Sequence, residues 1–361
     1  MVIPQSLPPG EEDERCHPAL ALDEETASRI LSCGCIHHSN MRQSWRQRKG
    51  DLGATLPSSP PAPSVVALVV PFREQHDQDR RAQLVAFERH MTSFLQASGS
   101  DDKSWQYILV IVEQAADGRP FNRGQLLNVG FREAQRHLTP AALVSVILHD
   151  VDLLPSRGLL RWYCEPPAAG RPCHIAGPST WKKYAVSAEY SARFFGGVTA
   201  LHPADFERAN GFPNDYWGWG MEDDQLRLRV DASQGLANGV ERPPEGAGRY
   251  DDIDPIKMGD RIRHERKVSM PDVRGWDNTV VERFNPKMWD MTSRQRLDDA
   301  WRTTNGLKGL VYDVQQRDER ELAGRRVVRI HVLAKLMSGY DCEYVERALH
   351  ALRSAERGLQ S

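Results

Sequence analysis

The sequence lacks several features that would assign it to a broad class of protein. Its 361 residues contain no run of 18 apolar residues, and its first residues, MVIPQSLPPGEEDER, lack the charged-then-apolar order of a signal peptide. The 47 basic and 49 acidic residues leave a net charge of −2, so no overall field attracts nucleic acid. Six cysteines in so long a chain do not indicate a disulfide framework. We therefore expect a soluble protein with no transmembrane segment and no nucleic-acid partner.

Composition and pattern predict three parts along the chain. Residues 1–63 are expected to form a flexible N-terminal extension that ends in the Pro-rich linker LPSSPPAPS. Residues 64–335 are expected to form a single folded domain, because the hydrophobic content of 40% suffices for one large core. Residues 336–361 are expected to form a C-terminal helical tail. Within the domain, the glycines, prolines and acidic residues of 236–259 predict an inserted loop.

Strand and helix patterns alternate from residue 64 onwards. SVVALVVPF at 64–72 is a continuous apolar run rich in valine, which predicts a buried strand of a parallel sheet. Further strands are predicted at 107–112, 142–148 and 327–334, and helices at 78–96 and 124–137. This alternation predicts an α/β fold in which helices flank the sheet.

Two aspartates follow the predicted strand at 142–148. Asp150 and Asp152 belong to the sequence HDVD, and residues two apart at the end of a strand point to the same side. Ligands of open α/β sheets gather at the carboxyl ends of the strands. Carboxylate oxygens there suit a hard divalent cation. An isolated pair of aspartates is common by chance, so the prediction of a cation site depends on the position of this pair after an apolar strand.

A second acidic group lies in the sequence PNDYWGWGMEDDQ at 213–225. Glu222, Asp223 and Asp224 follow a Trp-Gly-Trp-Gly run. A carboxylate beside aromatic rings is partly desolvated, which raises its proton affinity and suits it to take a proton from a hydroxyl. The same three residues also suit the first turn of a helix, where the macrodipole favours negative charge. Both interpretations stay open.

Several motifs together resemble the β-1,4-galactosyltransferase family of inverting, GT-A-fold glycosyltransferases. They are VPFR at 70–73, FNRGQLLNVGF at 121–131, HDVDLLP at 149–155, FFGGVTAL at 194–201, NGFPNDYWGWGMEDD at 210–224 and RIRHERK at 261–267. They occur in the family's order across about residues 65–314, and GLKGLVYDV at 306–314 resembles the family's closing strand. HDVDLLP is similar to the xylosylprotein 4-β-galactosyltransferase branch, whereas FGGV and NGFPN are similar to the lactose-type branch. The resemblance implies a GT-A-like, Rossmann-type mixed sheet in a single catalytic domain.

The resemblance also implies a role for particular residues. The donor-binding residues would be Pro71, Phe72, Arg73, Phe121, Arg123, Asp150, Val151, Phe194 and Trp219. Asp223 would be the general base that deprotonates the acceptor hydroxyl, with Glu222 and Asp224 orienting the sugars. On pattern alone, Phe72 and Phe121 are equally well explained as core residues.

The implied cofactor is Mn²⁺, with Asp152 and His264 as its protein ligands. The third protein ligand of the family is missing, because Arg261 and Arg266 stand where its branches carry methionine or histidine, and a guanidinium cannot coordinate a cation.

The resemblance implies transfer of galactose from UDP-galactose to a 4-hydroxyl of an acceptor sugar, in a β-1,4 linkage. The acceptor would be a glycan or glycoprotein, such as xylose of a proteoglycan linker or terminal N-acetylglucosamine. Alternatives are UDP-N-acetylgalactosamine or another hexose donor, and a catalytically weak binding relative. Family members act in the Golgi lumen, although the sequence itself leaves the compartment unknown.

Overall fold

The computed structural model describes residues 64–74, 79–97, 105–117, 119–138, 142–182, 188–218, 222–254, 299–322 and 327–337. The predicted N-terminal extension lies outside these residues. So does the predicted C-terminal tail, except for residues 336 and 337, which end a strand. Among the described residues, no helix is both long and apolar enough to cross a membrane.

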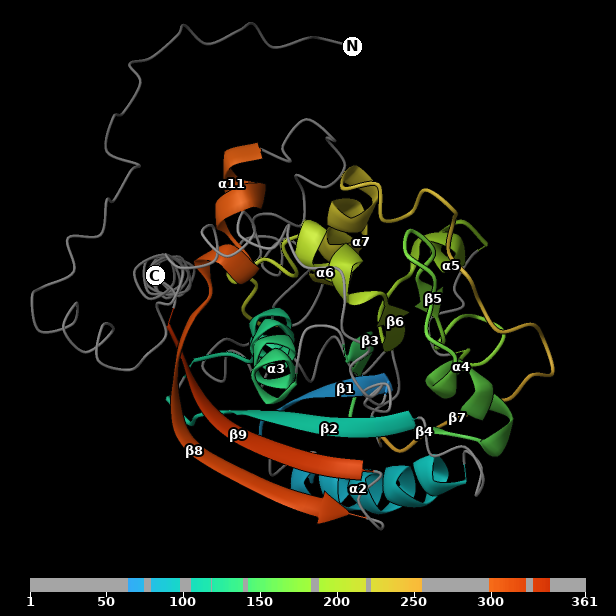
Figure 1. The fold of residues 1–361 in the computed structure, drawn as a ribbon, viewed down its shortest axis with the longest axis horizontal. Helices are drawn as coiled ribbons and strands as arrows, with labels where there is room; N and C mark the ends of the chain where they lie inside the picture. Colours follow the sequence, from blue (N-terminus) through green and yellow to red (C-terminus); the bar gives the residue numbers. More distant parts are fainter. Residues whose placement is uncertain are drawn as a thin grey trace, which may run out of the picture. The chain divides into compact units, whose positions relative to one another are not determined.

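A seven-stranded mixed sheet forms the centre of the described domain (Figure 1). Its strand order is β5-β6-β3-β1-β2-β9-β8. The bounds are β1 (Ser64–Phe72), β2 (Trp105–Gln114), β3 (Leu143–His149), β5 (Cys173–His174), β6 (Val198–Leu201), β8 (Val311–Leu322) and β9 (Val327–Met337). The four inner strands β3, β1, β2 and β9 are parallel, whereas β5, β6 and β8 run antiparallel to their neighbours. This confirms the predicted GT-A-like mixed sheet.

Helices cover both faces of the sheet, because side chains of the central strands alternate between two apolar clusters. The residues of β1 that face one way pack with α3 (Arg123–His137), α6 (Pro203–Arg208) and α7 (Glu222–Ala232). The residues that face the other way pack with α2 (Arg80–Gln96) and α4 (Leu160–Cys164). Figure 1 shows α2 and α3 on opposite sides of the sheet.

The remaining elements are short. They are the 3-10 helices η3 (Arg157–Leu159) and η5 (Leu307–Gly309) and the helices α5 (Ala188–Arg193) and α11 (Asp299–Thr304). The other strands and helices predicted from the sequence within the domain are present, with bounds that differ by a few residues. The segment 306–314 differs more, because Leu307–Gly309 form η5 and β8 begins at Val311 and continues to Leu322.

The prediction of an inserted loop at 236–259 is wrong in one respect. Residues Tyr250–Asp252 form strand β7, which pairs antiparallel with β4 (Leu153–Pro155) in a separate two-stranded sheet. A three-residue strand with two aspartates has no apolar alternation, so its pairing depends on a partner far away in the chain. This small sheet carries acidic residues of the loop to the end of β3.

Candidate active site

The turn after β3 holds Asp150 and Asp152 through backbone hydrogen bonds on both sides. The Asp150 amide donates to the Gly197 carbonyl over 3.0 Å, and the Ile253 amide donates to the Asp152 carbonyl over 2.9 Å. The second bond extends the pairing of β4 with β7. The turn is therefore held between the loop before β6 and the residues after β7.

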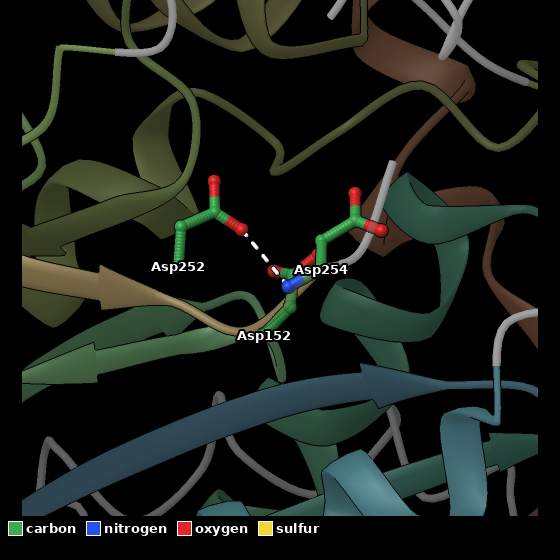
Figure 2. Close-up of side chains that lie close together, drawn as sticks. All are labelled: Asp152, Asp252 and Asp254. Atoms are coloured by element: carbon green, nitrogen blue, oxygen red, sulfur yellow. Dashed lines mark hydrogen bonds between the residues drawn. The ribbon is translucent and has the colours of Figure 1, made fainter. Parts of the chain in front are cut away.

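Three carboxylates meet at this turn. Asp152, Asp252 and Asp254 each offer a ligand atom, and these atoms lie within 4.8 Å of one another (Figure 2). Asp152 is 7% exposed. Oxygen donors at such spacing suit Mn²⁺, Mg²⁺ or Ca²⁺. Two carboxylates that the sequence did not predict here therefore lie beside Asp152. The prediction that Arg261 or Arg266 replaces the family's third ligand concerns positions outside the described residues.

Neighbouring groups orient this acidic triad. The Arg80 guanidinium donates to Asp152 Oδ2 over 3.0 Å, and the Trp181 indole nitrogen donates to Asp252 Oδ2 over 3.1 Å. The Asp254 amide donates to Asp252 Oδ1 over 3.0 Å, as the dashed line in Figure 2 marks. Three carboxylates and one guanidinium leave a net negative charge that matches a divalent cation.

His149 forms a hydrogen bond to the same turn but does not belong to the acidic triad. Its Nδ1 lies 2.8 Å from the Asp150 carbonyl, and its Nε2 lies 2.7 Å from the Tyr163 hydroxyl. Since a carbonyl only accepts, Nδ1 carries the hydrogen and Nε2 accepts. The hydroxyl of Tyr250 in β7 lies 2.8 Å from the Tyr163 hydroxyl and extends this hydrogen-bonded group. Burial lowers the pKa of His149 to about 4.

A second cluster forms where α7 begins, and Arg123 connects it to the turn. The Arg123 guanidinium donates to Asp223 Oδ1 over 2.6 Å and to Asp150 Oδ1 over 2.7 Å, and it lies 3.4 Å from Glu222 Oε1. Arg123 is the first residue of α3, and the Asn122 side chain caps that helix by accepting from the Gln125 amide over 2.9 Å. The cap fixes the arginine between the turn after β3 and the first residues of α7.

Burial changes the proton affinity of this cluster. It raises the pKa of Glu222 to about 8, and the neighbouring charge of Asp223 adds to the effect. Burial likewise raises the pKa of Asp150 to about 6 and that of Asp224 to about 6. For Asp150 the positive charge of Arg123 acts in the opposite direction. A pKa of about 8 favours the protonated form of Glu222 at neutral pH.

Gly196 lies directly against the predicted base. A Cβ atom on Gly196 would overlap Asp223 Oδ2, and it would also lie 3.0 Å from the Phe194 ring. The next residue, Gly197, has φ of +75°, a conformation that favours glycine. Gly196 therefore allows the backbone to approach the carboxylate closely, and Gly197 allows the turn that follows.

Buried amides hold the segment that leads into the Trp-Gly-Trp-Gly run. The Asn122 side chain donates to the Asn214 carbonyl over 2.7 Å, and the Asn128 side chain donates to the Phe212 carbonyl over 2.8 Å. The Gly218 amide then donates to the Phe121 carbonyl over 2.8 Å. These bonds tie the segment before α7 to the start of α3.

The predicted donor residues near the ends of β1 and β3 and before α3 divide between core and surface. Pro71, Phe72 and Val151 are buried, with Phe72 at 1% exposure inside an apolar cluster. Phe121 is half-buried, and the Arg73 guanidinium lies over its ring, 5.6 Å from the centroid. Of the two rings, Phe121 is thus the one with an accessible face.

Two predicted site residues, Trp219 and His264, lie outside the described residues. The structure brings together Asp150, Asp152, Arg123, Phe194, Glu222, Asp223 and Asp224. Sequence reasoning missed Arg80, Asp252 and Asp254. The only sequence signal for the two aspartates was the acidic content of 236–259, which does not by itself indicate a tertiary contact.

The fold and this arrangement of acidic and basic groups at the strand ends define a GT-A-like glycosyltransferase. A model described as the N-terminal region of glycosyl transferase group 7 matches residues 32–165, and one described as the N-terminal domain of galactosyltransferase matches residues 180–254. The chain belongs to the β-1,4-galactosyltransferase family.

Named relatives and solved structures agree with this assignment. Beta-1,4-galactosyltransferase 3 of Bos taurus is 33% identical over 255 residues, which are 71% of this chain and 52% of that protein. Beta-1,4-galactosyltransferase 5 of Sus scrofa is 37% identical over 188 residues, which are 52% of this chain and 42% of that protein. The chain thus spans about half the length of these relatives.

The crystal structure of the catalytic domain of Drosophila β1,4-galactosyltransferase 7 in complex with xylobiose is similar in fold. It is 28% identical, covers 76% of this chain and 95% of its own chain, and has a TM-score of 0.52. A mutant of that enzyme in complex with manganese, UDP-Gal and xylobiose is similar to the same extent.

Proposed function

We propose that the protein is an inverting β-1,4-galactosyltransferase that moves galactose from UDP-galactose to the 4-hydroxyl of an acceptor sugar. The observation that carries the proposal is the carboxylate of Asp223, held between the Arg123 guanidinium at 2.6 Å and the Gly196 backbone. Family membership supports the same reaction class. The acceptor would be a glycan or glycoprotein, with xylose of a proteoglycan linker or terminal N-acetylglucosamine as candidates.

In this proposal Asp223 accepts the proton of the acceptor hydroxyl. The hydroxyl oxygen then forms a bond to the anomeric carbon of the donor sugar while the bond from that carbon to the diphosphate oxygen breaks, and UDP leaves. A single displacement of this kind inverts an α-linked donor to a β-linked product. Arg123 orients Asp223 Oδ1, so Oδ2 is the oxygen that takes the proton. Protonated Glu222 can donate a hydrogen bond to a sugar hydroxyl, and Asp224 also orients the sugars.

The donor contacts in the proposal are those at the ends of β1 and β3. Arg73 and Phe121 would hold the uridine and phosphate side, while Asp150, Val151 and Phe194 would line the sugar. Pro71 and Phe72 would support this side from the core, and Trp219 would close over the sugars. Phe194 keeps the bulk of an aromatic ring near the sugar's C2 substituent, so galactose is proposed as the preferred donor over N-acetylgalactosamine.

Asp152 is proposed to hold Mn²⁺ together with Asp252 and Asp254, because their oxygens match the ligands that this ion prefers. When bound, the ion neutralises negative charge that develops on the departing diphosphate. His264 stays a proposed ligand outside the described residues. The related structure that contains manganese and UDP-Gal supports the choice of ion. A Golgi-lumen location is proposed from family membership.

The test is transfer with a panel of UDP-sugars and sugar acceptors in the presence of manganese, using wild type, Asp223→Asn and Asp231→Asn. Asp231 lies on α7 but is exposed, so its variant is a matched control. We expect Asp223→Asn to lower kcat on the order of 10²- to 10⁴-fold, with donor KM little changed. Near wild-type turnover by Asp223→Asn would exclude Asp223 as the base.

The same panel tests the alternative functions. Equal kcat/KM for UDP-galactose and UDP-N-acetylgalactosamine would favour the alternative donor, and donor binding without turnover would favour a binding relative.

A further inference from the structure

We propose that His174 is a positioning residue that holds the Gly196–Gly197 backbone in place for both Asp223 and Asp150. The inference rests on the proposed function, since it concerns how the proposed base and the donor-facing aspartate are aligned. His174 lies on β5, the edge strand of the sheet, and is not part of any motif that carried the family resemblance.

The hydrogen bonding of His174 is set by its surroundings. The ring is 0% exposed, and Nε2 lies 2.9 Å from the Gly196 carbonyl oxygen. A carbonyl only accepts, so Nε2 carries the hydrogen and donates. Nδ1 then holds a lone pair and has no hydrogen-bond partner within the described part of the chain. Burial lowers the pKa of His174 to about 3, so the ring is neutral and this donor is constant at working pH.

Stability alone does not explain a histidine at this position. A buried polar atom without a partner is destabilising, and this cost offsets the gain in stability from the Gly196 bond. The ring packs between Phe194 and Phe195, with centroids 5.3 Å and 5.9 Å away. A phenylalanine would fill this apolar volume without an unpaired nitrogen. The feature specific to histidine is the bond to the Gly196 carbonyl.

The Gly196–Gly197 backbone supports both sides of the proposed site. The Asp223 carboxylate rests against Gly196, where a Cβ would overlap it. The Gly197 carbonyl accepts the Asp150 amide over 3.0 Å. His174 therefore fixes, through one carbonyl, the segment against which the base and the donor-facing aspartate are both placed. Loss of that bond frees the peptide between Gly196 and Gly197 to rotate and moves both carboxylates.

Small displacements at a reacting centre have large kinetic effects. A shift of about 1 Å can lower a rate on the order of 10²-fold, because the reacting atoms leave the near-attack geometry. A misplaced base lowers kcat more than it raises donor KM, because the uridine and phosphate contacts proposed for Arg73 and Phe121 lie on other segments of the chain. A substitution of His174 is thus expected to lower kcat with a much smaller effect on donor KM.

Two variants separate the hydrogen bond from the packing. His174→Phe keeps a ring between Phe194 and Phe195 but removes the donor. His174→Gln loses the ring but retains an Nε2 donor that reaches the same carbonyl. The matched control is Phe131→Leu, a core substitution in α3 at a ring that packs on Phe206, away from the start of the helix. All three are measured for unfolding midpoint, kcat, donor KM and hydrogen exchange of the Asp150 amide.

We expect His174→Phe to lower kcat on the order of 10- to 100-fold with donor KM within about threefold, and to speed Asp150 amide exchange. His174→Gln should recover most of the lost kcat and most of the protection of the Asp150 amide from exchange. Phe131→Leu should lower only the unfolding midpoint. The proposal is overturned if His174→Phe matches Phe131→Leu in kcat and exchange, or if His174→Gln is no better than His174→Phe. The exchange measurement does not depend on turnover, so it decides the role of His174 whether or not the wild-type protein transfers sugar. A wild-type protein that transfers no sugar would refute the proposed function and would leave this measurement unaffected.

Discussion

Arg123 shows at the scale of single residues how the site tolerates crowded negative charge. Its guanidinium contacts Asp150 and Asp223 and lies 3.4 Å from Glu222, so one cation faces three carboxyl groups. Full ionisation of all three would leave repulsion that one arginine cannot offset. Glu222, which is the most buried of the three, instead keeps its proton, with a pKa raised to about 8.

This protonation makes stability depend on pH in a defined direction. The pKa of Glu222 is raised from 4.5 to about 8 on folding, so between these values the folded state binds a proton that the unfolded state releases. The free energy of unfolding contributed by Glu222 therefore falls as pH rises from about 5 to about 8. A glutamine at this position would mimic the protonated form at every pH. We therefore expect the free energy of unfolding of Glu222→Gln to fall less steeply with rising pH than that of the wild-type protein.

Urea unfolding midpoints at several pH values between 5 and 9 measure this effect. Glu245→Gln is the control, since Glu245 is exposed and its variant should keep the wild-type pH dependence. Asp150 and Asp224 titrate in both wild type and Glu222→Gln, so the difference between the two proteins reports mainly on Glu222. Parallel pH profiles for those two proteins would show that Glu222 is ionised in the folded state.

At the scale of elements, the pairing of β4 with β7 brings the acidic triad together. The pairing joins Leu153 to Asp252 and Pro155 to Tyr250, across nearly a hundred residues of chain. Each strand has only three residues, so neither is stable alone. The hydrogen bond from the Ile253 amide to the Asp152 carbonyl continues the pairing and sets Asp254 beside Asp152.

The triad predicts how manganese binding responds to substitution. Asp252→Asn and Asp254→Asn each remove a negative charge within 4.8 Å of the other ligand atoms, so each should weaken Mn²⁺ binding at least about tenfold. Asp251→Asn is the matched control, since Asp251 lies on the same strand but is exposed. Calorimetric titration of Mn²⁺ with UDP present measures all three. Unchanged affinity in the first two variants would leave Asp152 and His264 as the proposed ligands.

The contrast between these elements shows what the sequence can and cannot predict. Strand β1 was predicted correctly because eight of its nine residues are buried and make a continuous apolar run. Asp150, Asp152 and Asp223 were found because they belong to long motifs with a chemical rationale. Strand β7 was missed because its three residues alternate in no apolar pattern and its register is set by β4. Arg80 was missed because its contact with Asp152 spans 72 residues and leaves no local signal.

At the scale of the whole molecule, the sheet depends on the last described strand. β9 follows β8 in the sequence but lies between β2 and β8 in the sheet (Figure 1). It pairs parallel with β2 from Tyr107–Val327 to Gln114–Ala334, and antiparallel with β8 along its whole length. β8 itself is largely exposed and charged, so it has little apolar surface to hold it without β9.

A chain that ends after Leu322 should therefore fail to fold cooperatively. The truncation removes Val327, Ile330, Val332 and Leu336, each at most 1% exposed. At about 1.5–3 kcal/mol for each buried aliphatic side chain, the loss is roughly 6–12 kcal/mol, comparable with the about 5–15 kcal/mol that stabilises a whole domain. A chain that ends after Met337 keeps every described strand and serves as the control. Thermal unfolding followed by circular dichroism compares the two, and a cooperative transition of the shorter chain near the control's midpoint would show that β9 is dispensable for the fold.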